Sequence, residues 1–200
     1  FQAIDSIAMP ANSSPGYIWI VDSTRAYVAN YAGTVCLLNL TTRTVVQTSS
    51  AVVTFPGGII VNSGRVYVSD FGFFPNLKNI VKVLDGNSLA VVDSAKVGVG
   101  AGAMVAGTNR VYVVSSGSFP SKGKVYAINT TTPATVVDSI TVGDGPSDIA
   151  IKNQSLFVLH GDRVMKLNAA PLSVSDSSFV RISNALYFYA MQTDDITGDI

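Results

Sequence analysis

Side chains able to hold a metal ion or move a proton are few in this sequence, and they lie at expected turns. Asp70, Asp144, Asp148 and His160 fall at or beside the ends of short apolar runs. Carboxylate oxygens could bind Ca²⁺, and a carboxylate near an imidazole could act in acid–base catalysis. However, Asp144 lies in the glycine- and proline-containing stretch 143–146, where aspartate commonly forms turns, and His160 occupies a similar hairpin tip. We therefore predict no catalytic residue among these four.

The chain has one cysteine and one histidine, which narrows the possible chemistry further. A single cysteine excludes an internal disulfide and a metal site built from several cysteines. A single histidine gives little support to a zinc site or a Ser/His triad. Cys36 lies in the apolar run 35–38 and is predicted to be a buried, unreactive thiol. The glycine clusters separate expected strands and lead into no helix, so they do not predict a phosphate-binding loop. We expect no metal and no cofactor.

Aromatic side chains supply a stronger candidate for a functional site. Phe71, Phe73 and Phe74 all fall between Asp70 and Lys78, a segment that we expect to be a long loop between the second and third strands of its unit. Leaving such rings in water is costly, at about 25 cal/mol per Å² of apolar area. They either fold back over the protein or form an exposed apolar contact surface. Both interpretations stay open from the sequence.

Composition excludes two classes of partner. The 13 basic and 13 acidic residues cancel, and only 13% of the 200 residues are charged. No basic cluster is available to bind nucleic-acid phosphates. No segment approaches the ~18 consecutive apolar residues of a membrane-spanning helix. The sequence starts at Phe1, which is compatible with removal of a secretory leader.

An internal repeat determines the expected architecture. Four similar segments begin at residues 25, 65, 110 and 155, so consecutive starts are 40, 45 and 45 residues apart. These segments are Arg25-Ala26-Tyr27-Val28, Arg65-Val66-Tyr67-Val68, Arg110-Val111-Tyr112-Val113 and Ser155-Leu156-Phe157-Val158. Each is followed by an apolar run that ends in a polar residue, namely Asn39, Asp85, Asn129 or Asn168. We predict that these recurring side chains bond to the following turn.

Each unit contains four short runs rich in Val, Ile and Tyr, which are typical of β-strands. No window shows a sustained helical period, so helix should be minimal. Four strands in about 40–45 residues correspond to one β-propeller blade. Small sheets stacked around an axis bury both of their faces and leave only short edges. The sequence therefore predicts an all-β propeller of four-stranded blades.

The glycine- and proline-containing turns set the phase of the blades, because the run after each turn should be the innermost strand. The resulting segments are an outer strand of a preceding blade at 1–15, complete blades at 16–52, 53–98, 99–143 and 144–183, and the start of a further blade at 184–200. Four complete blades and two partial ones predict part of a ring of roughly seven blades. The alternative is an unusual small ring closed by the N-terminal strand. The fourth unit lacks the usual valine pair, and 174–182 is expected to take its place.

Two of the repeated segments carry a family resemblance. Tyr27-Val28-Ala29-Asn30 and Tyr67-Val68-Ser69-Asp70 resemble the Tyr-Val-Thr-Asn (YVTN) repeat of YncE-like bacterial propellers, whereas Phe157-Val158-Leu159-His160 departs from it. The resemblance covers essentially the whole chain. It implies an exported protein of the periplasm or cell surface. Members include surface lipoproteins that capture ligands, such as cobalamin, for an outer-membrane transporter; related propellers include lactonases and surface-layer proteins.

In a propeller, the loops that join strand 2 to strand 3 and strand 4 to the next strand 1 share one face, here called the loop face. We expect a non-catalytic propeller that binds a small-molecule ligand or an outer-membrane transporter on this face, with a possible lipid anchor upstream. The predicted binding residues are Tyr31, Phe55, Asp70, Phe71, Phe73, Phe74, Phe119, His160 and Tyr187. A lactonase-like enzyme and a structural surface-layer module are the alternatives.

Overall fold

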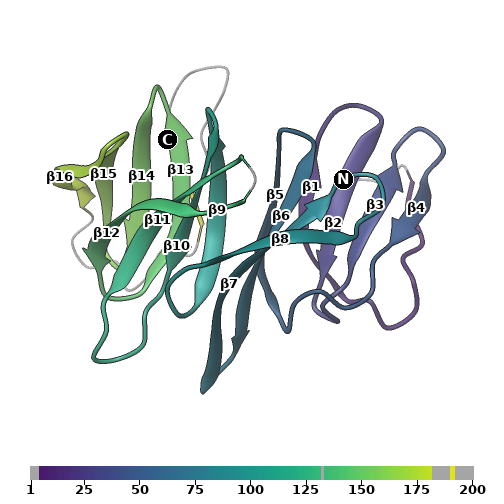
Figure 1. Ribbon diagram of the computed structural model, residues 1–200, viewed down its shortest axis with the longest axis horizontal. Helices are drawn as coiled ribbons and strands as arrows, with labels where there is room; N and C mark the ends of the chain where they lie inside the picture. Colours follow the sequence, from purple (N-terminus) through teal and green to yellow (C-terminus); the bar gives the residue numbers. More distant parts are fainter. Residues whose placement is uncertain (1–4, 132, 182–189, 192–200) are drawn as a thin grey trace.

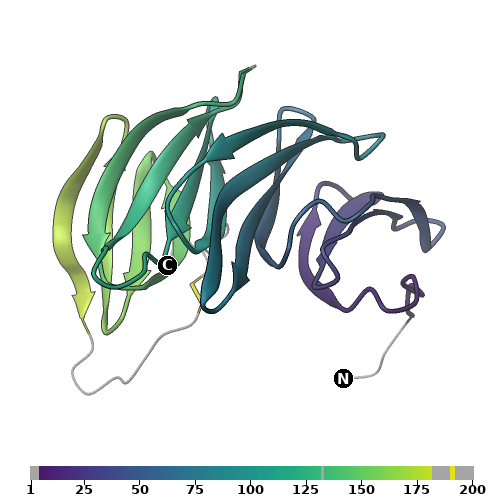
Figure 2. The same cartoon turned by 60° about the horizontal axis from the view of Figure 1, so that its bottom comes forward.

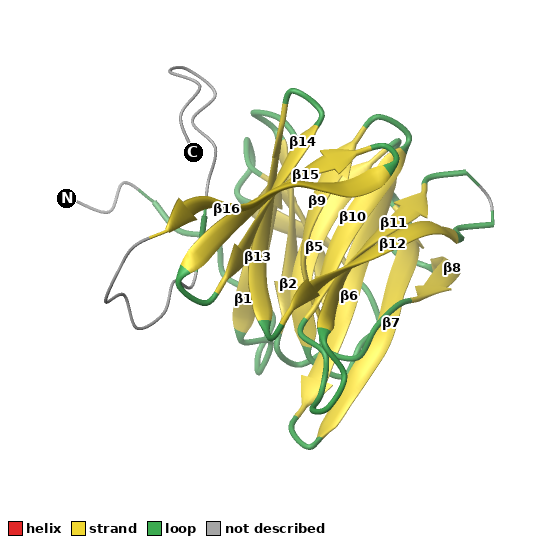
Figure 3. Cartoon of the chain, turned by 90° about the vertical axis from the view of Figure 1, so that its left-hand side faces the viewer, coloured by secondary structure: helices red, strands yellow, loops and turns green. Residues whose placement is uncertain are grey.

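The computed structural model describes residues 5–131, 133–181 and 190–191, and this part of the chain is all-β. Its sixteen strands form four antiparallel sheets of four strands each. Figure 3 shows strands and loops in this part of the chain and no helix. The prediction of an all-β protein with four-stranded units is therefore confirmed.

Within every sheet, the strands lie side by side in the order of the sequence. The first sheet contains β1 (Pro15–Ile20), β2 (Arg25–Asn30), β3 (Val35–Asn39) and β4 (Thr44–Thr48). The second contains β5 (Pro56–Asn62), β6 (Arg65–Phe73), β7 (Asn76–Asp85) and β8 (Val91–Lys96). The third contains β9 (Ala101–Gly107), β10 (Arg110–Ser115), β11 (Gly123–Asn129) and β12 (Val136–Gly143). The fourth contains β13 (Pro146–Lys152), β14 (Ser155–His160), β15 (Arg163–Ala169) and β16 (Leu172–Arg181).

The sheets are arranged as the blades of a propeller. The first strands β1, β5, β9 and β13 lie at the centre and contact one another in that order, while β4 and β16 lie at the periphery (Figure 1). Figure 2 shows the four sheets following one another along a curved row. The sheets fall within the four predicted blade segments, except that β1 begins one residue early. The number of blades in a complete ring stays a prediction.

The core lies between successive blades because each strand turns alternate residues to opposite faces. In β2, Tyr27 and Ala29 face the second blade, whereas Ala26 and Val28 lie in a separate cluster on the other face. Comparable buried clusters join the second blade to the third and the third to the fourth. Cys36 is fully buried in the cluster on the outer face of the first blade, as predicted. Side-chain packing between successive blades, rather than exchange of strands between them, therefore holds the structure together.

A tyrosine in the second strand bonds two blades together at two of the three junctions. The Tyr27 hydroxyl donates to the carbonyl oxygen of Gly86 at 2.6 Å, and the Tyr112 hydroxyl donates to that of Ala169 at 2.9 Å. Gly86 directly follows β7 and Ala169 is the last residue of β15, so both acceptors lie at the end of the third strand of the next blade. The equivalent hydroxyl of Tyr67 is buried and has no hydrogen-bond partner among the residues that the structure describes. The same repeated residue thus has two different environments.

An aspartate in the outer strand forms a second link between blades. Asp93 accepts a hydrogen bond from the backbone N–H of Ala134 in the third blade, and Asp138 accepts one from Leu172 in the fourth, at 2.7 and 2.8 Å. Each of these aspartates also accepts a bond from the N–H of the serine that follows it. These contacts attach each outer strand to the turn after the third strand of the next blade.

Residues near the N-terminus repeat these contacts on the first blade. Asp5 accepts from the N–H of Ser6 and pairs with Arg43, while Ile7 and Met9 pack against the outer cluster of the first blade. Residues 5–14 nevertheless form no strand. The assignment of 1–15 to the outer strand of a preceding blade stays a prediction.

The segment after Asp70 corrects one expectation. Instead of a long loop, β6 and β7 continue as a hairpin whose turn contains Phe74 and Pro75. Its backbone pairing extends through Phe73 and Asn76. Strand pairing continues because it satisfies backbone groups that a loop would leave to water. Hydrogen bonds between the third-strand polar residues and the turns that follow are confirmed. For example, the backbone N–H groups of Thr41 and Thr42 donate to the side-chain oxygen of Asn39.

Candidate functional site

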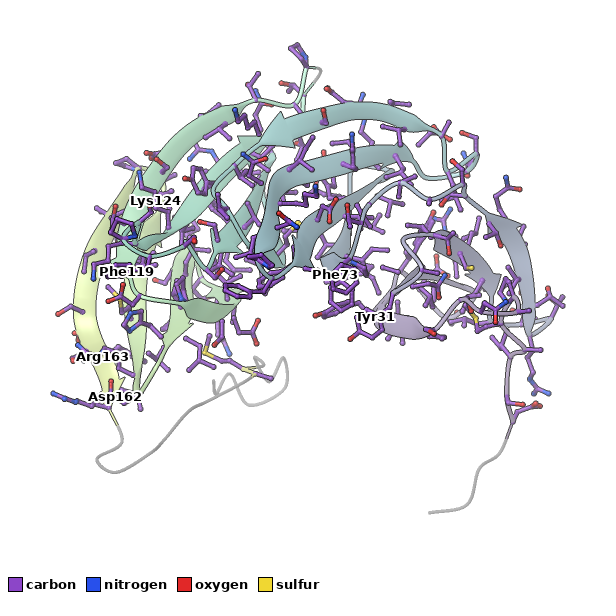
Figure 4. The ribbon with its side chains drawn as sticks, turned by 90° about the horizontal axis from the view of Figure 1, so that it is seen from below. Tyr31, Phe73, Phe119, Lys124, Asp162 and Arg163 are labelled. Atoms are coloured by element: carbon purple, nitrogen blue, oxygen red, sulfur yellow. The ribbon has the colours of Figure 1, made fainter. Side chains whose placement is uncertain are left out.

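The candidate site lies on the loop face, where the second strands end and the first strands begin. Figure 4 shows this face, with Tyr31 and Phe73 close together and Phe119 farther to the left. Two structural elements supply the site: the start of β1 with the end of β2, and the chain before β5 with the end of β6. Antiparallel pairing brings these ends together, because Pro15 pairs with Asn30 and Pro56 with Asp70.

Four aromatic rings form a continuous series across the first two blades, here called the aromatic cluster: Tyr17, Tyr31, Phe55 and Phe73. Tyr31 and Phe55 are stacked with their centroids 4.6 Å apart and their planes at 12°. Phe73 packs on Phe55 at 4.6 Å, and Tyr17 meets Tyr31 edge-on at 6.2 Å. Phe73 is 55% exposed and both tyrosines are 39% exposed. The cluster therefore combines ring–ring packing with apolar area open to solvent.

Buried polar contacts fix the position of the cluster. The two carboxylate oxygens of Asp70 accept hydrogen bonds from the backbone N–H groups of Thr54 and Phe55, at 2.8 and 3.1 Å. The N–H of Phe71 donates to the Phe55 carbonyl at 2.9 Å. Asp70 is 5% exposed. Its hydrogen bonds hold the loop that carries Phe55 in place.

Glycine is needed where one ring crosses the neighbouring strand. A Cβ added to Gly16 would lie 2.8 Å from Cζ of Tyr31. The missing side chain therefore lets the Tyr31 ring lie directly over the beginning of β1, toward Tyr17.

Each blade places one polar residue at the sixth position of its second strand. These residues are Asn30, Asp70, Ser115 and His160. The Asn30 side chain donates to Thr34 at 3.0 Å and to the sulfur of Cys36 at 3.3 Å. In contrast, both ring nitrogens of His160 are buried and have no hydrogen-bond partner in the described part of the chain. The His160 ring lies against Gly143, where a Cβ would be 2.4 Å from Nε2.

The structure brings together three of the predicted binding residues, Tyr31, Phe55 and Phe73, above Asp70. It places the other predicted phenylalanines elsewhere. Phe71 packs toward Gly100, while Phe74 and Phe119 are 86% and 99% exposed.

Of the two remaining predicted residues, one lies outside the cluster and the other outside the described residues, and one member of the cluster was not predicted. His160 belongs to the fourth blade, away from these rings, and Tyr187 lies outside the described residues. The sequence analysis missed Tyr17, although its position directly after Pro15-Gly16 indicates the loop-face end of an inner strand.

Tyr17 also lines a central cavity of about 540 Å³. Residues from the innermost strands of all four blades surround this cavity, together with Ala190 and Met191. Asp148 is its acidic side chain and accepts a 2.6 Å hydrogen bond from the N–H of Met191. Burial raises the pKa of the Asp148 carboxyl above its ordinary value. Burial, and then the nearby Tyr31 and Asp148, raise the pKa of the Tyr17 hydroxyl.

The candidate carboxylates lie in separate environments. Asp70 is buried beneath the aromatic cluster, Asp148 lines the central cavity, and Asp144 forms an exposed ion pair with Lys122 at 2.7 Å. Among the described residues, no three His, Cys, Asp or Glu side chains are placed to share a metal ion. No helix in the same part of the chain is long and apolar enough to cross a membrane.

No protein-family model and no curated protein matches this sequence. Solved structures are similar at low identity. Hydrazine synthase of Kuenenia stuttgartiensis has a TM-score of 0.72 and 15% identity, over 90% of this chain and 58% of that chain. A structure of U3-55K has a TM-score of 0.69 and 11% identity, over 92% and 54%. The WD40 repeats of RRP9 give 0.66 and 10%, over 90% and 52%.

The chain thus spans between 52% and 58% of the length of these three structures. Sequence identities this low are evidence for a shared fold and not for a shared function. Together with the four radially arranged sheets, they show that the chain has a β-propeller fold related to that of WD40 proteins.

Proposed function

We propose that this chain is a non-catalytic binding module that holds a ligand with a flat apolar surface on the aromatic cluster. One observation carries the proposal. Four rings from two blades touch in series at the loop face, and three of them are at least 39% exposed. Rings arranged only to complete a core would be covered, and exposed apolar area held in a fixed geometry is typical of binding surfaces.

The position of Tyr17 supports a ligand that extends inward from the surface. Tyr17 belongs both to the aromatic cluster and to the lining of the central cavity. A ligand stacked on Tyr31 and Phe55 could therefore reach the 540 Å³ space at the propeller axis. Concave, mostly apolar spaces with a few polar groups are common sites for small molecules.

We further propose that the protein is exported and acts at the bacterial cell surface or in the periplasm, where it delivers its ligand to an outer-membrane transporter. This part of the proposal depends on the resemblance of Tyr27-Val28-Ala29-Asn30 and its counterparts to the YVTN repeat. It leads to cobalamin as the first compound to test.

The experiment compares two double variants. Tyr31→Ala/Phe73→Ala removes two exposed rings of the cluster. Phe74→Ala/Phe119→Ala removes two rings of the same face that are more exposed and outside the cluster. Binding is measured by isothermal titration calorimetry with cyanocobalamin, and by ligand-observed NMR with a set of flat aromatic compounds.

We expect a ligand of the wild-type protein to bind the cluster variant at least about tenfold more weakly, because each stacked ring contributes roughly 0.5–1.5 kcal/mol beyond its buried area. The control variant should bind as the wild type does. Both should keep a melting temperature within a few degrees of the wild type. Equal loss in the two variants, or the absence of binding by any compound, would refute the proposal. A large loss of stability in the cluster variant alone would instead assign the rings to local packing.

A further inference from the structure

A second cavity opens at the opposite ends of the strands, between the third and fourth blades. It has a volume of about 530 Å³ and is here called the basal pocket. Its lining comes from the β9–β10 turn, the β13–β14 turn and the end of β15: residues 107–110, Tyr112, 151–154, Ala169 and Ala170. Because the strands run between the two faces, the basal pocket is separate from the aromatic cluster.

The charged residues of this lining are both basic. Among the described residues, they are Arg110 and Lys152, and no described aspartate belongs to the lining. Within the described part of the chain, Nη1 of Arg110 is buried and has no hydrogen-bond partner. A guanidinium is always charged and offers five donors, so a buried donor without an acceptor is costly.

The repeat provides an internal comparison, because Arg25 and Arg65 occupy the same strand position as Arg110. Arg65 pairs in register with Asp85, whereas Arg110 pairs with Asn129. Hydrogen bonds from Ser88 and Asn87, and more weakly the charge of Arg65, lower the pKa of Asp85. In the third blade, which lines the basal pocket, an amide thus lies opposite the arginine where the second blade has a carboxylate.

In the first blade, an asparagine also lies opposite the arginine, but another carboxylate is nearby. Arg25 pairs in register with Asn39, but Asp22 lies close by. Hydrogen bonds from Thr24, and then the charge of Arg25, lower the pKa of Asp22. Arg25 therefore has a neighbouring carboxylate and serves as a matched control for Arg110.

The rim of the basal pocket supplies further donors of suitable chemistry. Asn109, Asn153 and Gln154 all lie in exposed turns with positive φ, of 55°, 48° and 61°. Their side-chain amides can donate to an oxygen ligand. The Tyr112 hydroxyl is already bonded to the carbonyl of Ala169, which fixes the wall of the pocket.

We propose that the basal pocket binds a small oxyanion, the carboxylate or phosphate group of a ligand, through Arg110 with support from Lys152. Two observations support this site: the cavity is lined by Arg110 and Lys152, and among the described residues the buried Nη1 of Arg110 has no hydrogen-bond acceptor. A planar guanidinium matches both carboxylate and phosphate oxygens. This site is independent of the aromatic cluster and of its proposed ligand.

The test uses amide chemical shifts of the ¹⁵N-labelled protein. Inorganic phosphate and succinate are titrated separately, each against sodium chloride of the same ionic strength. We expect saturable shifts at residues 107–110 and 151–154 with at least one probe. Phosphate alone, succinate alone or both would identify a phosphate, a carboxylate or a shared oxyanion site, respectively.

Arg110→Gln should weaken binding about tenfold or more, because it removes a charge-assisted hydrogen bond. Arg25→Gln should leave it unchanged. If Arg110→Gln does not fold, Lys152→Gln decides the question in the same titration, and weaker binding supports the proposal. Shifts that match the chloride reference with both probes, or unchanged affinity in the deciding variant, would overturn it.

Discussion

The tyrosine of the repeated second strand allows a sharp test of how the blades are joined. Tyr27 and Tyr67 occupy equivalent positions and are 2% and 0% exposed. The hydroxyl of Tyr27 donates to the Gly86 carbonyl at 2.6 Å, whereas that of Tyr67 has no partner among the described residues. Replacement of each by phenylalanine removes the same atom from two different environments.

The expected effects differ in sign. Tyr27→Phe removes a buried hydrogen bond and leaves a carbonyl without that donor, which should lower the free energy of unfolding by about 1–2 kcal/mol. Tyr67→Phe removes a buried hydroxyl that pays a desolvation cost without compensation, so it should be neutral or stabilise by about 1 kcal/mol. For a chain of this size, each kcal/mol corresponds to a change of about 2–4 °C in melting temperature.

Equilibrium unfolding in urea, followed by circular dichroism, measures both variants beside the wild type. Unchanged slopes with denaturant would show that the midpoint shifts report stability. Tyr112→Phe provides a check, because its hydroxyl donates to Ala169 and it should behave like Tyr27→Phe. Equal destabilisation by Tyr27→Phe and Tyr67→Phe would refute the reasoning.

Two further predictions concern the contacts between blades. Gly57→Ala should lower the free energy of unfolding by about 2 kcal/mol or more, because the added Cβ would lie 2.4 Å from the carbonyl oxygen of Ala101. Gly102→Ala is the control: its added Cβ would have no atom nearer than 3.7 Å, so it should have little effect in the same urea assay. Hydrogen bonds from the N–H groups of Ala134 and then Ser94 lower the pKa of Asp93, so its stabilising contribution is present above the ordinary aspartate pKa of about 4 and is lost below it. The melting temperature of Asp93→Asn should therefore fall less than that of the wild type between pH 7 and pH 3, and an equal fall would contradict this link.

The blade architecture could be predicted from the sequence because the strands are short, repeated and separated by recognisable turns. Arg65-Val66-Tyr67-Val68 and its counterparts gave the second strands, which are β2, β6, β10 and β14. The fourth outer strand was also located, since β16 covers most of the expected run 174–182. Short apolar runs suffice for this purpose, because strands that are buried on both faces read as nearly continuous apolar segments.

The candidate site could be predicted only in part, because rings on different blades meet through loop geometry. Tyr31 of the first blade and Phe55 of the second are 24 positions apart in the sequence, yet their centroids lie 4.6 Å apart. Phe74 is next to Phe73 but turns outward, since successive residues of a hairpin point to opposite sides. The role of Asp70 beneath Phe55 could not be predicted either, because its sequence neighbours do not indicate which backbone N–H groups will donate hydrogen bonds to its carboxylate.

The polar residue at the sixth position of each second strand has a consequence for engineering this protein. Asn30, Asp70, Ser115 and His160 differ in charge, size and hydrogen-bonding capacity, yet the strand pairing around them is the same. Side-chain chemistry at this point can therefore vary from blade to blade while the scaffold is maintained. New specificities could be introduced on one sector at a time, with the other three left as internal references.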